Sequence, residues 1–224
     1  MQSSTLRRSF LRVPLNKRGA VWTGVADSEI VAHLPGENAA APVVLRDLST
    51  LPRTGFKGAE SPAWLEAQGV VLPTAPNLAT RQADGSLVAR LAPGEFLILG
   101  GLAGSSAAID RLDTAWSIDT AGFCFQLPRR DSHAWLHLSG DKVATMFAKI
   151  CGVDLRPQAF ANLAIAQTSV ARLSAIVIRD DRETMPGYHL LADSAAAIYL
   201  WESLEDAMAE FSGSIAGYSS LTLP

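Results

Sequence analysis

The feature that most constrains the fold is a sequence pattern that occurs twice along the chain. The segment "FKGAESPAWLEAQGVVLP" at 56–73 is similar to "LSGDKVATMFAKICGVDLRP" at 138–157, with Gly58 and Gly140 lying 82 residues apart. Two further blocks follow in the same order: "LVARL" (87–91) matches "SVARL" (169–173), and "EFLILGGLAGSSAAIDRL" (95–112) matches "YHLLADSAAAIYLWESL" (188–204). Three matching blocks in one order predict a duplicated unit of about 80 residues.

Each copy predicts a strand, a glycine turn, a helix, two strands and a second helix. In the first copy the helix contains Pro62 in its first turn and buries Trp64 and Leu65. In the second copy a helix from Asp141 to about Gly152 is followed by an antiparallel strand pair, "LSAIVI" and "YHLLA". The apolar helix positions of the second copy are Val143, Met146, Phe147 and Ile150, then Ala197, Leu200, Trp201 and Leu204. This alternation predicts an α+β fold.

The predicted domain organisation is a basic N-terminal arm over 1–26 and a single domain over 27–224. The domain consists of two repeats, at about 43–125 and 126–213, and no linker rich in Pro, Gly or Ser separates them. The arm carries five basic and no acidic residues, so a net charge of −3 for the chain leaves −8 on the remainder. We expect the arm to be mobile and to contact a partner.

Composition narrows the function classes. The negative net charge argues against nucleic acid as a partner. Only 18% of the residues are charged, below the roughly 25% of typical soluble domains, which favours some apolar surface for a partner protein. No run of 18 apolar residues predicts a membrane span. "TLRRSFLR" resembles a twin-arginine signal but has no apolar segment behind it, and Cys124 and Cys151 form no CxxC motif. A cytoplasmic protein is expected.

Two glycine-rich segments resemble ligand loops. "GFKG" around Lys57 does not have the GxxxxGK[ST] order of a phosphate-binding loop, and its counterpart "LSGD" contains no lysine, which favours a structural turn. "ILGGLAGSSAA" at 98–108 does not have GxGxxG spacing. Anion or nucleotide binding by Gly100 to Gly104 at the following helix N-terminus remains a minor alternative.

The remaining polar motifs do not form a catalytic constellation. His133 and His137 have i, i+4 spacing, which would suit a metal on a helix, but alternating apolar residues between them predict a strand. "DDRE" at 180–183 is interpreted as a solvated hairpin tip. No GxSxG motif is present, and neither cysteine has a neighbouring histidine. We predict no catalytic residue and no metal ligand.

Five stretches together resemble the gamma subunit of heterotetrameric sarcosine oxidase. They are "DLSTLPRTGFKGAESPAWL", "LPRRDSHAWLHLSG", "KICGVDLRP", "AQTSVARLSAIVIR" and "YHLLADSAAAIYLWESLEDAM", and the similarity spans about 45–213. The assembly that oxidises N-methylglutamate has a similar subunit. Wider relatives are the folate-binding aminomethyltransferases of glycine cleavage and the YgfZ-like proteins. The resemblance implies their two-unit fold, and we expect no C-terminal barrel domain.

The resemblance also implies a role. Such a complex demethylates sarcosine oxidatively to glycine and passes a one-carbon unit to tetrahydrofolate. Its alpha, beta and delta subunits would be the partners of this chain and would carry FAD, FMN and NAD. We expect no cofactor on this chain itself, with tetrahydrofolate as the one candidate ligand.

Two positions can be compared with the working residues of the aminomethyltransferases. Their Asp pair matches Ala89 and Arg90, and the Glu that hydrogen-bonds the pterin matches Met185, aligned on Arg179 and Gly187. A carboxylate accepts two directed hydrogen bonds, and a thioether does not replace it. The favoured hypothesis is therefore a non-catalytic gamma-type subunit that docks through its basic arm and apolar helix faces.

The alternative is a stand-alone folate-binding protein or one-carbon transferase. In that case Lys57, Arg90 or Arg172 would hold the glutamate tail of the folate.

Overall fold

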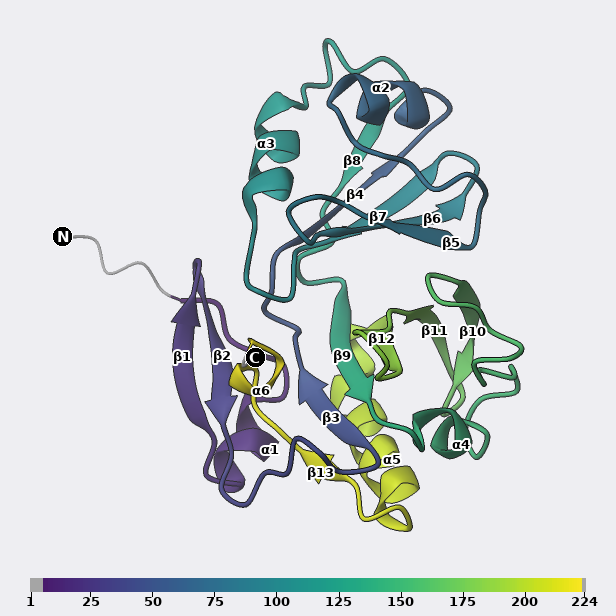
Figure 1. Cartoon of the computed structure of the whole chain (residues 1–224). Coiled ribbons are helices and arrows are strands. Elements are labelled where there is room, and N and C mark those ends of the chain that lie inside the picture. Colours follow the sequence, from purple (N-terminus) through teal and green to yellow (C-terminus); the bar gives the residue numbers. More distant parts are fainter. Residues whose placement is uncertain (1–5, 223–224) are drawn as a thin grey trace, which may run out of the picture. The chain divides into compact units, whose positions relative to one another are not determined.

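A computed structural model describes residues 6–222 of the chain. Contacts between residues divide the chain into two compact units. Unit 1 comprises the described residues of Met1–Thr50, His133–Asn162 and Ala166–Pro224, and unit 2 comprises Leu51–Ser132 with Leu163–Ile165. Each unit contains one larger sheet with its own helices (Figure 1). Because the first fifty residues belong with the second half, neither unit is a continuous stretch of chain.

Unit 2 contains a five-stranded antiparallel sheet in the order β5-β6-β7-β4-β8. Its elements are β4 (Arg53–Lys57), α2 (Ser61–Ala67), β5 (Leu78–Arg81), β6 (Leu87–Ala92), β7 (Glu95–Leu99), α3 (Ala107–Ala115) and β8 (Phe125–Leu127). The core joins apolar side chains of the sheet to those of both helices, including Phe56, Leu65, Phe96, Ile98, Ile109 and Leu112. Trp64 of α2 packs against this core at 4.9 Å between ring centroids from Phe56.

Unit 1 contains a six-stranded sheet in the order β10-β11-β12-β9-β3-β13. Its elements are α1 (Arg12–Lys17), β1 (Val21–Val25), β2 (Ser28–His33), β3 (Val44–Asp47), β9 (His133–Ser139), α4 (Val143–Phe147), β10 (Ile165–Val170), β11 (Leu173–Arg179), β12 (Gly187–Asp193), η1 (Ser194–Ala196), α5 (Ala197–Ala209), β13 (Ser214–Ile215) and α6 (Ser219–Thr222). Strands β1 and β2 form a separate hairpin. Strand β13 runs parallel to β3, whereas the pairs β3–β9, β9–β12 and β12–β11 are antiparallel.

The two sheets share the neighbour order of four consecutive strands. In unit 2 this order is β5-β6-β7-β4, and in unit 1 it is β10-β11-β12-β9. Each sheet has one further strand beside the last strand of this order. In unit 2 it is β8, which precedes β9 in the chain but pairs with β4. In unit 1 it is β3, which precedes β4 in the chain but pairs with β9. The predicted mixed α+β fold is confirmed. The duplication itself stays a prediction.

Gly58 forms the strand-to-helix turn of unit 2. Its φ of 143° lies in a region that residues with a side chain avoid. Its N–H donates to the carbonyl of Gly94 at 2.9 Å, and the N–H of Glu60 donates to the carbonyl of Phe123 at 3.2 Å. The glycine therefore lets the chain pass close to two neighbouring segments and then enter α2.

Gly140 makes the same turn in unit 1. Its φ is 130°, and its N–H donates to the carbonyl of Pro186 at 3.1 Å. The N–H of Lys142 donates to the carbonyl of Pro42 at 3.0 Å, as that of Glu60 does to Phe123 in unit 2. The interpretation of both glycines as structural turns is confirmed.

The equivalence of the two VARL segments is wrong. Residues 87–91 lie inside β6, whereas Ala171 and Arg172 form a two-residue turn with φ of 49° and 67° between β10 and β11. The residue of unit 1 in the position of Arg90 is Arg179. Arg90 of β6 pairs with Phe96 of β7, and Arg179 of β11 pairs with Tyr188 of β12, the strand that takes the place of β7 in the sheet of unit 1. The two VARL sequences occupy different backbone positions, although they are 82 residues apart like the two glycines, because the loops of the two units differ in length.

The predicted helix faces and strand pair are observed. Strands β11 and β12 form the antiparallel pair, and His133 and His137 lie on strand β9. The helix expected from Asp141 is shorter, Val143–Phe147. The predicted core positions Val143, Met146, Phe147, Ala197, Leu200, Trp201 and Leu204 are buried, and Ile150 is half-buried.

The described part of the predicted arm, residues 6–26, contains α1 and β1. Leu11 and Leu15 are fully buried, so these residues are part of the core of unit 1 rather than of a free arm. The first five residues lie outside the described part of the chain. Arg12 donates to Glu29 at 2.5 Å and Arg18 pairs with Glu205, so these basic side chains have partners within the chain.

Candidate functional site

Lys57, the first candidate for a folate tail, lies at the end of β4. Its Nζ is 2.9 Å from Oε2 of Glu95, and its side chain is 61% exposed. Oε1 of the same carboxylate accepts a hydrogen bond of 2.8 Å from Arg129. Two cations therefore share one acid, and Lys57 is the more exposed of the two.

Arg90, the second candidate, lies on β6 with its guanidinium 5.5 Å from the ring centroid of Phe96. Its Nη1 and Nη2 donate to the carbonyls of Pro73 and Pro93 at 3.1 and 2.8 Å. Arg90 lies opposite Phe96 of β7, and Lys57 lies opposite Glu95 of the same strand. Because adjacent residues of a strand point to opposite faces of the sheet, the side chains of Arg90 and Lys57 lie on opposite faces. One folate tail on one face of this sheet would not contact both.

Arg172, the third candidate, lies in unit 1. It is exposed on the β10–β11 turn, where it lines a hollow of about 570 Å³ together with Lys149 and Asp206. Among the described residues its guanidinium has no hydrogen bond or ion pair. Of the three candidates it is the one whose charge is available to a ligand without the loss of an internal contact.

Two positions that the sequence comparison aligns with carboxylates of the aminomethyltransferases differ in exposure. Ala89 is fully buried within β6, and Met185 is 48% exposed in the loop between β11 and β12. Neither side chain accepts the hydrogen bonds that a pterin ring donates.

The glycine-rich segment before α3 has acids of its own at the helix N-terminus. Ser106 is the N-cap residue, and its Oγ donates to Asp110 in the first turn at 2.7 Å. Burial acts against ionisation of Asp84, but hydrogen bonds from Ser86 and from the backbone N–H of Ala108 lower its pKa overall. These carboxylates occupy the position that an external anion would need, which argues against nucleotide binding there.

A row of basic side chains crosses the sheet of unit 1 and was missed from the sequence. Arg46 of β3 pairs in register with His137 of β9, which pairs with His189 of β12. All three are at most 3% exposed. The row depends on the register of three strands that are far apart along the chain, so sequence spacing alone does not reveal it.

His189 lies at the centre of a buried hydrogen-bond chain. The indole N–H of Trp135 donates to its Nδ1 at 3.1 Å, and its Nε2 lies 3.1 Å from Oδ2 of Asp180. Because an indole only donates, Nδ1 is the acceptor and Nε2–H donates to the carboxylate. Asp180 is 1% exposed, so the interpretation of "DDRE" as a solvated tip is wrong at this residue.

Arg179 is also buried next to that loop. Its guanidinium pairs with Asp181 and donates to the carbonyls of Pro157 and Phe160. Only Arg182 to Met185 form an exposed tip. Asp180 and Asp181 are therefore partners of the buried side chains of His189 and Arg179, whereas Glu183 lies on the exposed tip.

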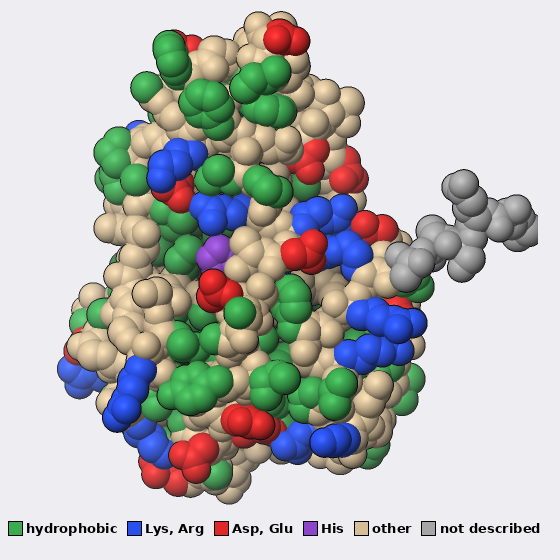
Figure 2. All heavy atoms as spheres, turned by 180° about the vertical axis from the view of Figure 1, so that it is seen from behind, with side chains coloured by type: hydrophobic (Ala, Val, Ile, Leu, Met, Phe, Trp, Pro, Cys, Tyr) green, Lys and Arg blue, Asp and Glu red, His purple; other side chains and the backbone are tan. Residues whose placement is uncertain are grey.

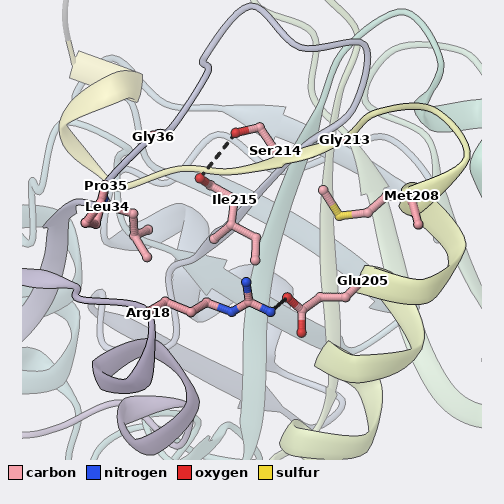
Figure 3. A pocket seen from close by; sticks show the side chains of 10 residues that line it. Arg18, Leu34, Pro35, Gly36, Glu205, Met208, Gly213, Ser214 and Ile215 are labelled. Carbon is pink, nitrogen blue, oxygen red and sulfur yellow. Dashed lines mark hydrogen bonds and ion pairs between the residues drawn. The ribbon is translucent and has the colours of Figure 1, made fainter.

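Another hollow of unit 1, about 580 Å³, lies between the loop after β2 and the end of α5 (Figure 3). Arg18 and Glu205 meet across it as an ion pair. Burial raises the pKa of Glu205, and the charge of Arg18 opposes that rise. Because the two charges compensate each other, this hollow offers no unpaired charge for an ionic ligand.

Cys124 and Cys151 are both free and buried. Within residues 6–222, no group of three or more His, Cys, Asp or Glu side chains is arranged to hold a metal ion. No helix in that range is long and apolar enough to cross a membrane.

Comparison with known proteins finds the same fold in two solved structures. A chain of the heterotetrameric sarcosine oxidase from Corynebacterium sp. U-96, solved in complex with pyrrole 2-carboxylate, matches with a TM-score of 0.68 and 24% identity over 93% of this chain and 97% of that chain. The glycine cleavage system aminomethyltransferase T from Bartonella henselae matches with a TM-score of 0.70 and 15% identity over 96% of this chain.

This chain spans 61% of the length of the aminomethyltransferase. No family model and no curated protein matches the sequence. At these identities the likenesses show a shared fold, and the function has to be argued from the residues.

Proposed function

We propose that this chain is a non-catalytic, gamma-type subunit of a sarcosine oxidase-like complex that demethylates a secondary amine oxidatively. The observation that carries the proposal is the likeness in fold to a chain of a heterotetrameric sarcosine oxidase, which extends over 97% of that chain. The partners would be alpha, beta and delta-type subunits. FAD, FMN, NAD and the one-carbon step with tetrahydrofolate would belong to them.

The surface supports a role in assembly. Large apolar side chains are exposed in both units, including Ile118 and Phe123 in unit 2 and Ile198 and Tyr199 in unit 1, at 48–66% exposure. Figure 2 shows hydrophobic side chains lying between interspersed basic and acidic groups on one face. Apolar surface of this kind is typical of contacts with a partner protein.

The residues of the site support the absence of a catalytic role. Ala89 and Met185 stand where the aminomethyltransferases have carboxylates, and the guanidinium of Arg90 is bound to two backbone carbonyls. The alternative, a stand-alone folate-binding protein or one-carbon transferase, is favoured by the likeness to aminomethyltransferase T alone.

Co-expression with a candidate alpha-type subunit tests the proposal. We expect an affinity tag on either chain to retain both in a stoichiometric complex, and the double variant Ile118→Asp, Phe123→Asp to weaken retention. A matched control is Thr145→Asp, which introduces a carboxylate at an exposed position of α4 where the native side chain is already polar. Isolation of the untagged chain in the flow-through, with no mixed complex at any salt concentration, would overturn the proposal.

A further inference from the structure

A further cavity of unit 1, about 290 Å³, lies over the basic row of the sheet. Its polar lining residues are Arg46, His137, Ser139, Arg182, Glu183 and Ser220. The row contributes Arg46 and His137, and the loop between β11 and β12 contributes Arg182 and Glu183. The cavity therefore combines two guanidinium groups and an imidazole with a single carboxylate.

Arg46 is a buried charge without a carboxylate in its hydrogen bonds. Its Nε and Nη1 donate to the hydroxyls of Ser220 and Ser139 at 2.7 and 2.8 Å, and the side chain is 3% exposed. Burial lowers the pKa of Arg46 to about 10, partly offset by the charge of Glu37, so the group remains a cation at neutral pH. Hydroxyls solvate this charge but do not neutralise it.

His137 is buried with both ring nitrogens free of hydrogen bonds within the described chain. The ring is 1% exposed, and its Nε2 approaches Gly187, another lining residue of the cavity. Burial first, and then the charges of His189, Arg46 and Arg182, hold the pKa of His137 well below its usual value, so the ring is neutral. A neutral imidazole offers one donor, and leaving a buried donor without an acceptor is unfavourable.

Arg182 supplies the second charge from the rim. It lies on the exposed tip of the loop, and its Nη1 donates to the carbonyl of Leu221 at 2.6 Å. Its charge acts on both Arg46 and His137 and lowers the pKa of each. The floor of the cavity is therefore positive, and its rim places the charge of Arg182 beside the carboxylate of Glu183.

We propose that this cavity binds a small oxyanion, a carboxylate or a phosphate group, between Arg46 and Arg182, with the N–H of His137 as a directed donor. Met185 and Leu221 line the same cavity and offer apolar contacts to a short carbon body. The inference does not depend on the proposed role in a complex.

Anion titration of the full chain tests this inference. Acetate, propionate and inorganic phosphate are added at constant ionic strength with chloride as the reference, and binding is followed by calorimetry and by the ¹⁵N shifts of the His137 ring. We expect saturable binding with a Kd on the order of 1 mM and a shift of the His137 nitrogens. Tighter binding of propionate or of phosphate identifies which oxyanion the cavity prefers.

Two arginine variants make the test specific. Arg182→Gln should weaken binding at least about tenfold, because it removes one of the two charges at an exposed position that does not threaten folding. Arg156→Gln, an exposed arginine of the same unit paired with Asp154, should weaken it less than about twofold. Equal weakening by the two variants, or no saturation below about 100 mM beyond that of chloride, would overturn the inference.

Discussion

The two sheets carry different side chains on equivalent rows. The row that crosses β6, β7, β4 and β8 in unit 2 is apolar, and the row that crosses β11, β12, β9 and β3 in unit 1 contains three basic side chains. The residues are Ala89, Leu97, Gly55 and Leu127 in unit 2 and Ile178, His189, His137 and Arg46 in unit 1. The same strand order therefore supports an apolar surface in one unit and a charged cavity in the other.

The space above each row is filled differently. In unit 2, Arg129 lies over Gly55, since a Cβ added to that glycine would be 2.9 Å from Cγ of Arg129. Arg129 in turn pairs with Glu95. In unit 1, His137 occupies the position of Gly55 and a cavity remains. The comparison teaches that the backbone sets where a site can lie, and that individual side chains decide whether one exists.

The largest expected effect tests what the two units have in common. A Cβ at Gly58 would lie 1.9 Å from the carbonyl oxygen of Phe123, and one at Gly140 would lie 2.2 Å from that of Pro42. Because both positions also require positive φ, Gly58→Ala and Gly140→Ala should each cost about 3 kcal/mol or more of unfolding free energy. Chemical denaturation measures the loss, and hydrogen exchange should place it in unit 2 for the first variant and in unit 1 for the second.

Gly69→Ala is the matched control. Its φ of 77° is also positive, but an added Cβ has no neighbour within 4 Å, so a loss of only about 1 kcal/mol is expected. If all three variants lose the same stability, the close backbone approach is not what these glycines provide.

The next effect tests the difference between the rows through pH. Because burial lowers the pKa of His137 in the folded state, the unfolded state binds more protons below pH of about 6.5. The contribution of the neutral His137 ring to the free energy of unfolding should be complete above that pH. It should fall on acidification by up to about 1.4 kcal/mol per pH unit. His137→Leu, which makes the row apolar as in unit 2, should remove this part of the slope between about pH 7 and 5.

The charged neighbours of His137 stay in place in that variant. They are Arg46, Arg182 and Glu37, and the lowered pKa of Glu37 affects stability only in a more acidic range. His33→Leu is the control: it removes an exposed histidine and should leave most of the dependence of the unfolding free energy on pH. An unchanged slope in His137→Leu would show that this ring is not buried neutral.

The smallest effect compares one equivalent position in the two units. Ser139 of β9 accepts a hydrogen bond from the buried guanidinium of Arg46, and Lys57 of β4 pairs with Glu95 near the surface. Ser139→Ala should cost about 1–2 kcal/mol, whereas Lys57→Gln should cost about 0.5 kcal/mol or less because solvent screens the exposed pair. Thermal or urea unfolding measures both, and the opposite ranking would contradict the account.

Local patterns predicted the local structure well. Glycines at strand-to-helix turns and the spacing of apolar residues along α4 and α5 identified these elements, because turn geometry and burial act on neighbouring residues. The buried roles of Asp180 and Arg179 were missed, since a run of charges resembles a solvent-exposed loop. Their partners, such as His189 and Phe160, are set by sheet register and loop packing.

The candidate folate residues were predicted by charge alone, and the structure separates them. Lys57 and Arg90 lie on opposite faces of one sheet, and Arg172 lies in the other unit. Sequence could not show this, because the face of a strand residue depends on its register and the VARL match gave the wrong register.

Calorimetry of the full chain with tetrahydrofolate and with free glutamate tests the central claim most directly, namely that the chain has an aminomethyltransferase-like fold without pterin recognition. Glutamate is the matched control because it reproduces the charged tail of the folate. We predict that tetrahydrofolate binds no more tightly than glutamate, since Ala89 and Met185 accept no hydrogen bonds from a pterin. Binding of tetrahydrofolate at least about tenfold tighter than glutamate would contradict the claim and favour the folate-binding alternative.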